Sequence, residues 1–62
     1  MTQSVIGDYL QDILDSIVAI EEFIEGMSID NFKQDKKTVF AVTRAIEIIG
    51  EAVKNFRLSV QY

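Results

Sequence analysis

The sequence predicts an all-α protein, an antiparallel hairpin of two helices that homo-oligomerisation completes into a four-helix bundle. Two stretches of the 62-residue chain repeat apolar residues at alternating intervals of three and four positions, which is the spacing of one helix face. Neither stretch alternates apolar and polar residues with period two, as a strand would, and the chain contains no proline. We therefore expect a single domain over residues 1–62, without β-structure.

The first helix is expected over about residues 5–25. Ser4 is its predicted N-cap, because a short polar side chain can accept a hydrogen bond from the first turn of the helix. Gly26 follows the last apolar position, where glycine commonly ends a helix. The apolar repeat consists of Ile6, Leu10, Ile13, Ile17, Ile20 and Ile24.

A connector of about residues 26–35 leads to the second helix, which is expected over about residues 36–58. Ile29 and Phe32 lie three positions apart in the connector, so one helical turn there can fold over the open end of the hairpin. Asp35 is the predicted N-cap of the second helix. The second apolar repeat consists of Val39, Val42, Ile46, Ile49, Val53, Phe56 and Val60.

Both helices carry more apolar surface than one neighbour can cover. At about 100° per residue, the apolar and small residues of the second helix span roughly 200°, whereas contact with a single neighbour needs only about 100°. Another copy of the chain is the simplest cover, which predicts a homodimer or a higher homo-oligomer. The predicted packing and interface residues are Ile13, Ile17, Ile20, Ala41, Ala45, Ile46, Ile49, Gly50 and Val53.

Gly50 stands in the middle of the second helix, although an interior glycine costs roughly 1 kcal/mol relative to alanine. It lies at the edge of the apolar arc, beside Ile46 and Val53. A missing side chain at such a position lets another backbone come close. We therefore expect a close helix crossing at Gly50.

Three charged residues of the second helix, Arg44, Glu47 and Glu51, lie on the opposite, polar side. One interpretation is a solvated face with weak pairs such as Arg44–Glu47. The other starts from Glu47 and Glu51, which are like charges four positions apart and leave room for an Arg or Lys of a partner. These three residues are the candidate partner-facing positions.

Composition excludes several classes of site. The chain has no cysteine and no histidine, so disulfides and the commonest metal ligands are absent, and we expect neither a metal nor a cofactor. Its first residues contain no basic segment followed by an apolar core, so we expect no signal peptide. No stretch approaches the roughly 18 apolar residues of a membrane span. These features indicate a cytoplasmic protein that does not bind membranes.

The net charge of −4 is distributed unevenly. Residues 1–32 contain seven of the ten acidic residues and no Lys or Arg, while residues 33–62 contain all six basic residues. Opposite charges favour antiparallel pairing of the two helices, and we expect Lys36 and Lys37 to meet the acidic end of the first helix. A continuous basic stripe is missing, so direct nucleic-acid binding is not expected.

Two longer stretches, "DYLQDILDSIVAIEEFIEG" and "FKQDKKTVFAVTRAIEIIGEAVKN", resemble the first two helices of the HepT-like branch of the HEPN family. The resemblance covers about 50 residues in the order and spacing of the family. The matching positions are Tyr9, Leu10, Asp12, Ile13, Leu14, Ile17, Ile20, Phe23, Gly26, Phe32, Asp35, Ala41, Arg44, Ile46, Ile49, Gly50, Glu51 and Ala52.

The resemblance implies an all-α, dimeric protein related to the toxins of toxin–antitoxin pairs, which are metal-independent ribonucleases. It also implies a partner, a minimal nucleotidyltransferase of the MNT-like type that neutralises the toxin. Family members are about twice as long and carry an Arg-x(4–6)-His motif on a later helix. Here neither Arg44 nor Arg57 is followed by a histidine. No catalytic residue is therefore assigned, and of the family's polar positions only Arg44, Glu47 and Glu51 are carried over.

Three interpretations follow from the resemblance and its gaps. The first is a truncated, non-catalytic HepT-like protein that dimerises and binds a nucleotidyltransferase or a full-length relative. The second is an active ribonuclease toxin subunit whose missing helices another chain supplies. The third is a purely structural assembly or the product of a decayed gene. We take the first as the prediction, because acid–base catalysis near neutral pH by the family's route requires a histidine.

Overall fold

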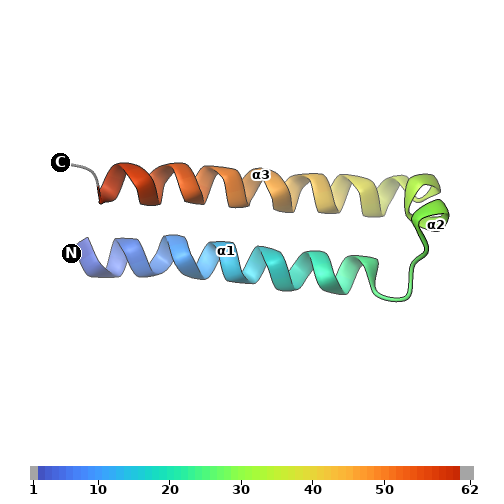
Figure 1. Ribbon diagram of the computed structural model, residues 1–62, viewed down its shortest axis with the longest axis horizontal. Coiled ribbons are helices and arrows are strands. Elements are labelled where there is room, and N and C mark those ends of the chain that lie inside the picture. Colours follow the sequence, from blue (N-terminus) through green and yellow to red (C-terminus); the bar gives the residue numbers. More distant parts are fainter. Residues whose placement is uncertain (1, 61–62) are drawn as a thin grey trace.

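The structure, a computed structural model, describes residues 2–60 of the chain and the side chains of residues 5–60. It contains the helices α1 (Thr2–Ile24), α2 (Ile29–Gln34) and α3 (Lys36–Ser59). Figure 1 shows α1 and α3 side by side and antiparallel, with α2 at the end where the chain passes from one to the other. The hairpin measures 45 × 15 × 14 Å and the described residues contain no strand, which confirms the predicted all-α hairpin.

The first helix begins earlier than expected. α1 starts at Thr2, so Ser4 lies inside the helix and the prediction of Ser4 as N-cap is wrong. The residues before Ser4 include no glycine or proline that would stop a helix there. At its other end α1 stops at Ile24, and Gly26 has a φ of 73°, a left-handed conformation that glycine adopts without steric cost.

The connector contains a helix of its own, α2. Ser28 caps it, because the Asn31 N–H donates a hydrogen bond of 3.1 Å to the Ser28 hydroxyl oxygen. Phe32 is half-buried, whereas Ile29 is 73% exposed. Of the two apolar residues that predicted a turn here, only Phe32 therefore packs substantially against the hairpin.

Asp35 caps α3, as the sequence predicted. Its carboxylate accepts hydrogen bonds from the Thr38 hydroxyl at 2.8 Å and from the Thr38 backbone N–H at 3.1 Å. These two hydrogen bonds stabilise the charged form of Asp35 and therefore lower its pKa below its ordinary value of 3.8. The bond from the Thr38 hydroxyl has the larger effect, followed by the bond from the Thr38 backbone N–H.

The Asp35 cap is expected to make the free energy of unfolding depend on pH. Because the pKa of Asp35 is lower in the folded chain than in the unfolded chain, its stabilisation is complete above pH 3.8 and is lost as the pH falls through the folded pKa. We expect Asp35→Ala to lower the Tm by several degrees near neutral pH and by much less in strong acid. Melting followed by circular dichroism checks this, with Asp30→Ala as the control. A Tm difference that is the same at every pH would contradict it.

The core of the hairpin is small. Among the described side chains only Ser16, Val42, Ala45 and Ala52 are buried, and no large side chain is fully buried. Large apolar side chains remain exposed along both long helices, up to 76% at Phe40. Even so, no described helix has a stretch apolar enough to cross a lipid bilayer. The hairpin alone therefore buries little apolar surface, which makes its stability marginal.

Candidate functional site

A polar groove lies between the N-terminal half of α1 and the middle of α3, from Arg44 to Asn55. It has a volume of about 200 Å³, and Ile48 and Ala52 form its floor. Polar side chains from both helices line it: Tyr9 and Asp12 from α1, with Arg44, Glu47, Glu51 and Asn55 from α3. Because α3 places residues three and four positions apart on one side, the predicted polar positions come together in this groove.

The groove is acidic. Asp12, Glu47 and Glu51 contribute three carboxylates, and Arg44 is the single cation. The Arg44 Nη1 and Glu47 Oε1 atoms lie 3.8 Å apart, but both side chains are largely exposed, at 73% and 63%. An exposed pair of this kind contributes about 0–1 kcal/mol. The groove is therefore suited to a positively charged group rather than to a phosphate.

An apolar trough of about 310 Å³ lies on the same side of the hairpin, next to the polar groove, and small residues line much of it. Ser16 and Ala45 are buried at its floor, and Ala19 and Ala41 are half-buried beside them. Such small side chains let α1 and α3 approach closely. Within the described residues, small side chains are therefore buried between α1 and α3 at Ser16 and Ala45, whereas Gly50 is exposed and no atom outside its own helix lies near it.

The predicted packing residues occupy different environments. Ala45 is buried, while Ile17, Ile46, Gly50 and Val53 are exposed. A Cβ atom placed on Gly50 would meet no atom within 4 Å in the described chain, apart from its own helix backbone and neighbours. Within the described residues, no other segment therefore approaches Gly50 closely. The remaining four are half-buried: Ile13, Ile20, Ala41 and Ile49.

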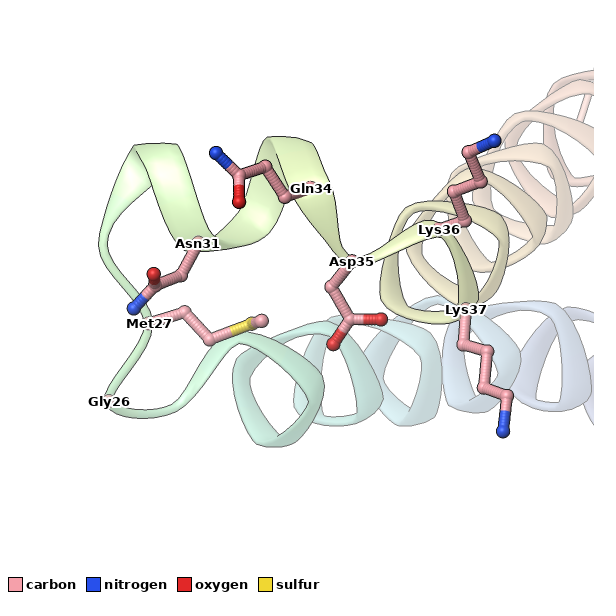
Figure 2. A pocket seen from close by; sticks show the side chains of 7 residues that line it. All are labelled: Gly26, Met27, Asn31, Gln34, Asp35, Lys36 and Lys37. Atoms are coloured by element: carbon pink, nitrogen blue, oxygen red, sulfur yellow. The ribbon is translucent and has the colours of Figure 1, made fainter.

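A wide hollow of about 710 Å³ lies at the connecting end, beside Asp35, Lys36 and Lys37 (Figure 2). Two lysines at the start of a helix could suggest an anion site. However, the Asp35 carboxylate already accepts the Thr38 N–H, and Figure 2 shows the two lysine side chains extending in different directions. This hollow therefore lacks the convergent positive charge that an anion needs.

The expected contact of Lys36 and Lys37 with the acidic end of α1 is not formed. Arg44–Glu47 is the only ion pair among the described residues. The lysines extend from the first turn of α3 into solvent, and both are exposed. No three acidic side chains in the described part of the chain are grouped so that they could hold a metal ion.

The sequence did not predict Tyr9, Asp12 or Asn55 as site residues. Tyr9 and Asp12 are among the positions that match the family, but nothing in the sequence placed either of them beside Arg44, Glu47 and Glu51. Only the register of the antiparallel pair, which sets Tyr9 level with Ala52, brings them to the groove. A signal was present in the four-residue spacing of Glu47, Glu51 and Asn55.

Comparison with known proteins gives a consistent result. The family described as Ribonuclease HepT-like matches residues 13–60 of this chain. A protein of Thermococcus cleftensis named "Probable ribonuclease HepT" is 58% identical over 48 residues, which are 77% of this chain and 44% of that protein. A protein of Methanocaldococcus jannaschii, named as a candidate RNase, is 51% identical over 47 residues, which are 76% of this chain and 39% of that protein.

These similarities have a limited extent. The chain spans about two fifths of the length of these two relatives. No solved structure gives a significant match. The family match includes Arg44, Glu47, Glu51 and Asn55 of the groove, but it begins after Tyr9 and Asp12. The α3 side of the groove thus lies in the family region, and part of its α1 side lies outside it.

Proposed function

Because this chain belongs to the Ribonuclease HepT-like family, we propose that it acts as a self-associating helical module of that family and does not cleave RNA by itself. The relationship of this chain to ribonucleases follows from its family membership. Self-association is supported by the structure of one surface, and the lack of catalysis by the composition of the chain. Each part has its own test.

One surface carries the proposal of self-association. Exposed apolar side chains of α1 and α3 lie on the same side of the plane that contains both helix axes, opposite the polar groove, because each antiparallel helix turns about 100° per residue. Their exposed fractions range from 43% to 57%. We call this surface the broad apolar face; it consists of Leu10, Leu14, Ile17, Ile46 and Val53, together with Gly50.

Burying this face against a second copy would form a four-helix bundle. Fully burying each aliphatic side chain is worth about 1.5–3 kcal/mol, and a two-fold arrangement counts every contribution twice. Sedimentation equilibrium of the purified chain tests the proposal. We expect a mass of two chains or a multiple of it at micromolar concentration, and a stably folded monomer would overturn the proposal.

The absence of RNA cleavage is a separate prediction. The 62-residue sequence has no histidine, the side chain that most often moves protons near neutral pH, and the groove offers three carboxylates and one arginine instead. We expect the purified chain to leave labelled RNA intact over hours, with a known ribonuclease as the positive control. Cleavage that survives repeated purification and is lost in Arg44→Ala would instead favour an active ribonuclease subunit.

We also propose a protein partner for the polar groove, a minimal nucleotidyltransferase of the kind implied by the resemblance to toxin–antitoxin pairs. The acidic rim at Glu47 and Glu51 supports this, since it is exposed and complementary to an Arg or Lys side chain. Co-expression with a nucleotidyltransferase encoded beside this gene, followed by pull-down, tests the idea. We expect Glu47→Lys/Glu51→Lys to abolish the complex and Asp30→Lys to preserve it. The idea fails if the parent chain captures nothing.

A further inference from the structure

The polar groove and the apolar trough adjoin along the hairpin. Arg44 and Ile48 line both of them, so the acidic part passes directly into the apolar part. The α1 wall runs from Tyr9 to Phe23, a rise of about 21 Å or four turns of helix. We call the two hollows together, with the lining residues named above, the groove–trough channel.

Both walls of the channel have the spacing with which helices pack on one another. In each wall, successive residues of one stripe are alternately three and four positions apart, as in the contact seams of helix bundles. The stripe on α1 consists of Tyr9, Asp12, Ser16, Ala19 and Phe23. The stripe on α3 consists of Ala41, Ala45, Ile48, Ala52 and Asn55. Because the middle of both stripes is mostly Ala or Ser, a helix laid in the channel can come close to both walls.

Ser16 is a polar side chain that the hairpin leaves without a hydrogen-bond partner. It is only 7% exposed, at the floor of the channel. None of the side-chain hydrogen bonds among the described residues involves its hydroxyl. Since no fully enclosed polar side-chain atom of the described chain lacks a partner, the part of Ser16 that stays open includes its hydroxyl oxygen. A group in the channel would therefore meet a free hydrogen-bond donor and acceptor there.

We propose that the groove–trough channel seats a single helix of the partner protein, packed along both α1 and α3. This helix has small side chains where it crosses Ser16 and a polar group that hydrogen-bonds the Ser16 hydroxyl. A Lys or Arg further along it reaches the carboxylates of Glu47 and Glu51. The inference rests on the partner proposed above for the polar groove, and it adds the apolar half of the contact and its helical form.

Charge and side-chain size favour a different protein over a second copy as the occupant. The groove part of the channel has three carboxylates and one arginine, so it is complementary to a cationic side chain. The α1 helix of a second copy carries no Lys or Arg. The α3 helix carries basic residues, but its small side chains Ala45 and Ala52 are already buried in its own hairpin. Neither helix of this chain thus offers both features at once.

Ser16→Ala tests the channel with little change in side-chain volume. Its affinity for the nucleotidyltransferase encoded beside this gene is measured by titration calorimetry with both purified proteins. We expect the dissociation constant to rise about 3- to 10-fold, because one hydrogen bond is lost. The Tm of the chain alone should not fall, since the hydroxyl has no partner in the hairpin. A lower Tm with an unchanged dissociation constant would mean that Ser16 serves the hairpin and not the partner.

Ala19→Trp tests the apolar half by filling the trough from its α1 wall. We expect the dissociation constant to rise about 10- to 100-fold, because the added ring occupies the place of the helix. Gln11→Trp is the matched control: it adds the same ring to an exposed position of α1 outside the channel and outside the broad apolar face. Its dissociation constant should change by less than about threefold. Equal weakening by both variants would overturn the proposal.

The variants of the groove separate this inference from the proposed partner itself. If Glu47→Lys/Glu51→Lys abolishes the complex while Ser16→Ala and Ala19→Trp bind as the parent chain does, the partner contacts the groove alone, and only the helix in the channel is wrong. If the parent chain binds no nucleotidyltransferase, both the partner and the helix are wrong. If Ala19→Trp instead dissociates the chain's own assembly in sedimentation equilibrium and leaves partner binding intact, a second copy occupies the channel and the inference is overturned.

Discussion

Ile46→Asp is expected to convert the assembled chain into monomers. Ile46 is 56% exposed in the single hairpin and lies on the α3 half of the broad apolar face. The substitution removes an apolar contact and adds a carboxylate that would have to lose its water, and symmetry makes it act twice in a dimer. We expect a loss of about 2–4 kcal/mol per dimer, or roughly a 30- to 700-fold rise in the dissociation constant. Sedimentation equilibrium over a concentration series measures it.

Phe40→Asp provides the matched control. Phe40 is also an exposed apolar residue of α3, at 76%, but it lies outside the broad apolar face. It receives the same new charge on the same helix, and we expect the dissociation constant to change by less than about threefold. Equal weakening by both variants would mean that the added charge, rather than the face, controls assembly. Unchanged assembly in Ile46→Asp would mean that copies do not meet on this face.

Two substitutions of Gly50 are expected to differ in their effect on assembly, which Gly50→Ala should preserve and Gly50→Leu should disrupt. Nothing in the described chain, apart from its own helix, occupies the space beside this residue. Gly50→Ala therefore needs no adjustment inside the hairpin, and it should raise helix stability by about 0.5–1 kcal/mol. Gly50→Leu fills the space that a second copy would use, and overpacking at two symmetric sites should cost roughly 2–6 kcal/mol of assembly energy.

Melting temperature and mass separate the two effects. We expect Gly50→Ala to keep the assembled mass and melt slightly higher, and Gly50→Leu to lose assembly. Glu51→Leu is the control for the added leucine, because the next residue lies on the polar side of α3. If Gly50→Leu changes neither the mass nor the Tm, no second backbone or side chain approaches Gly50.

The sequence predicted the local features of the chain, because each of them depends on residues that are close together along the chain. The period of the apolar residues identified both long helices, and Asp35 with Thr38 three positions later makes the cap of α3. The sequence also indicated the family, because the matching residues are recognised by their order and spacing along the chain. The predicted start of α1 was wrong because a residue type that often caps helices, such as Ser4, can also lie inside one, and here Thr2 and Gln3 are helical as well.

The sequence predicted only part of the candidate site. Arg44, Glu47 and Glu51 share one helix, so their common face follows from helix geometry alone. Tyr9 and Asp12 joined them only in the folded hairpin, because their place depends on how far α1 slides along α3. Such a register is set by many side-chain contacts at once, and no short segment contains it.

The sequence by itself determined that this chain forms two amphipathic helices with more apolar surface than a hairpin can bury, because periodicity and amount of apolar residues are properties of the linear order. Only the tertiary structure decided where that surface is covered. Small side chains at Ser16 and Ala45 let α1 and α3 approach on one side of the hairpin, and this leaves Ile46, Gly50 and Val53 exposed on the other.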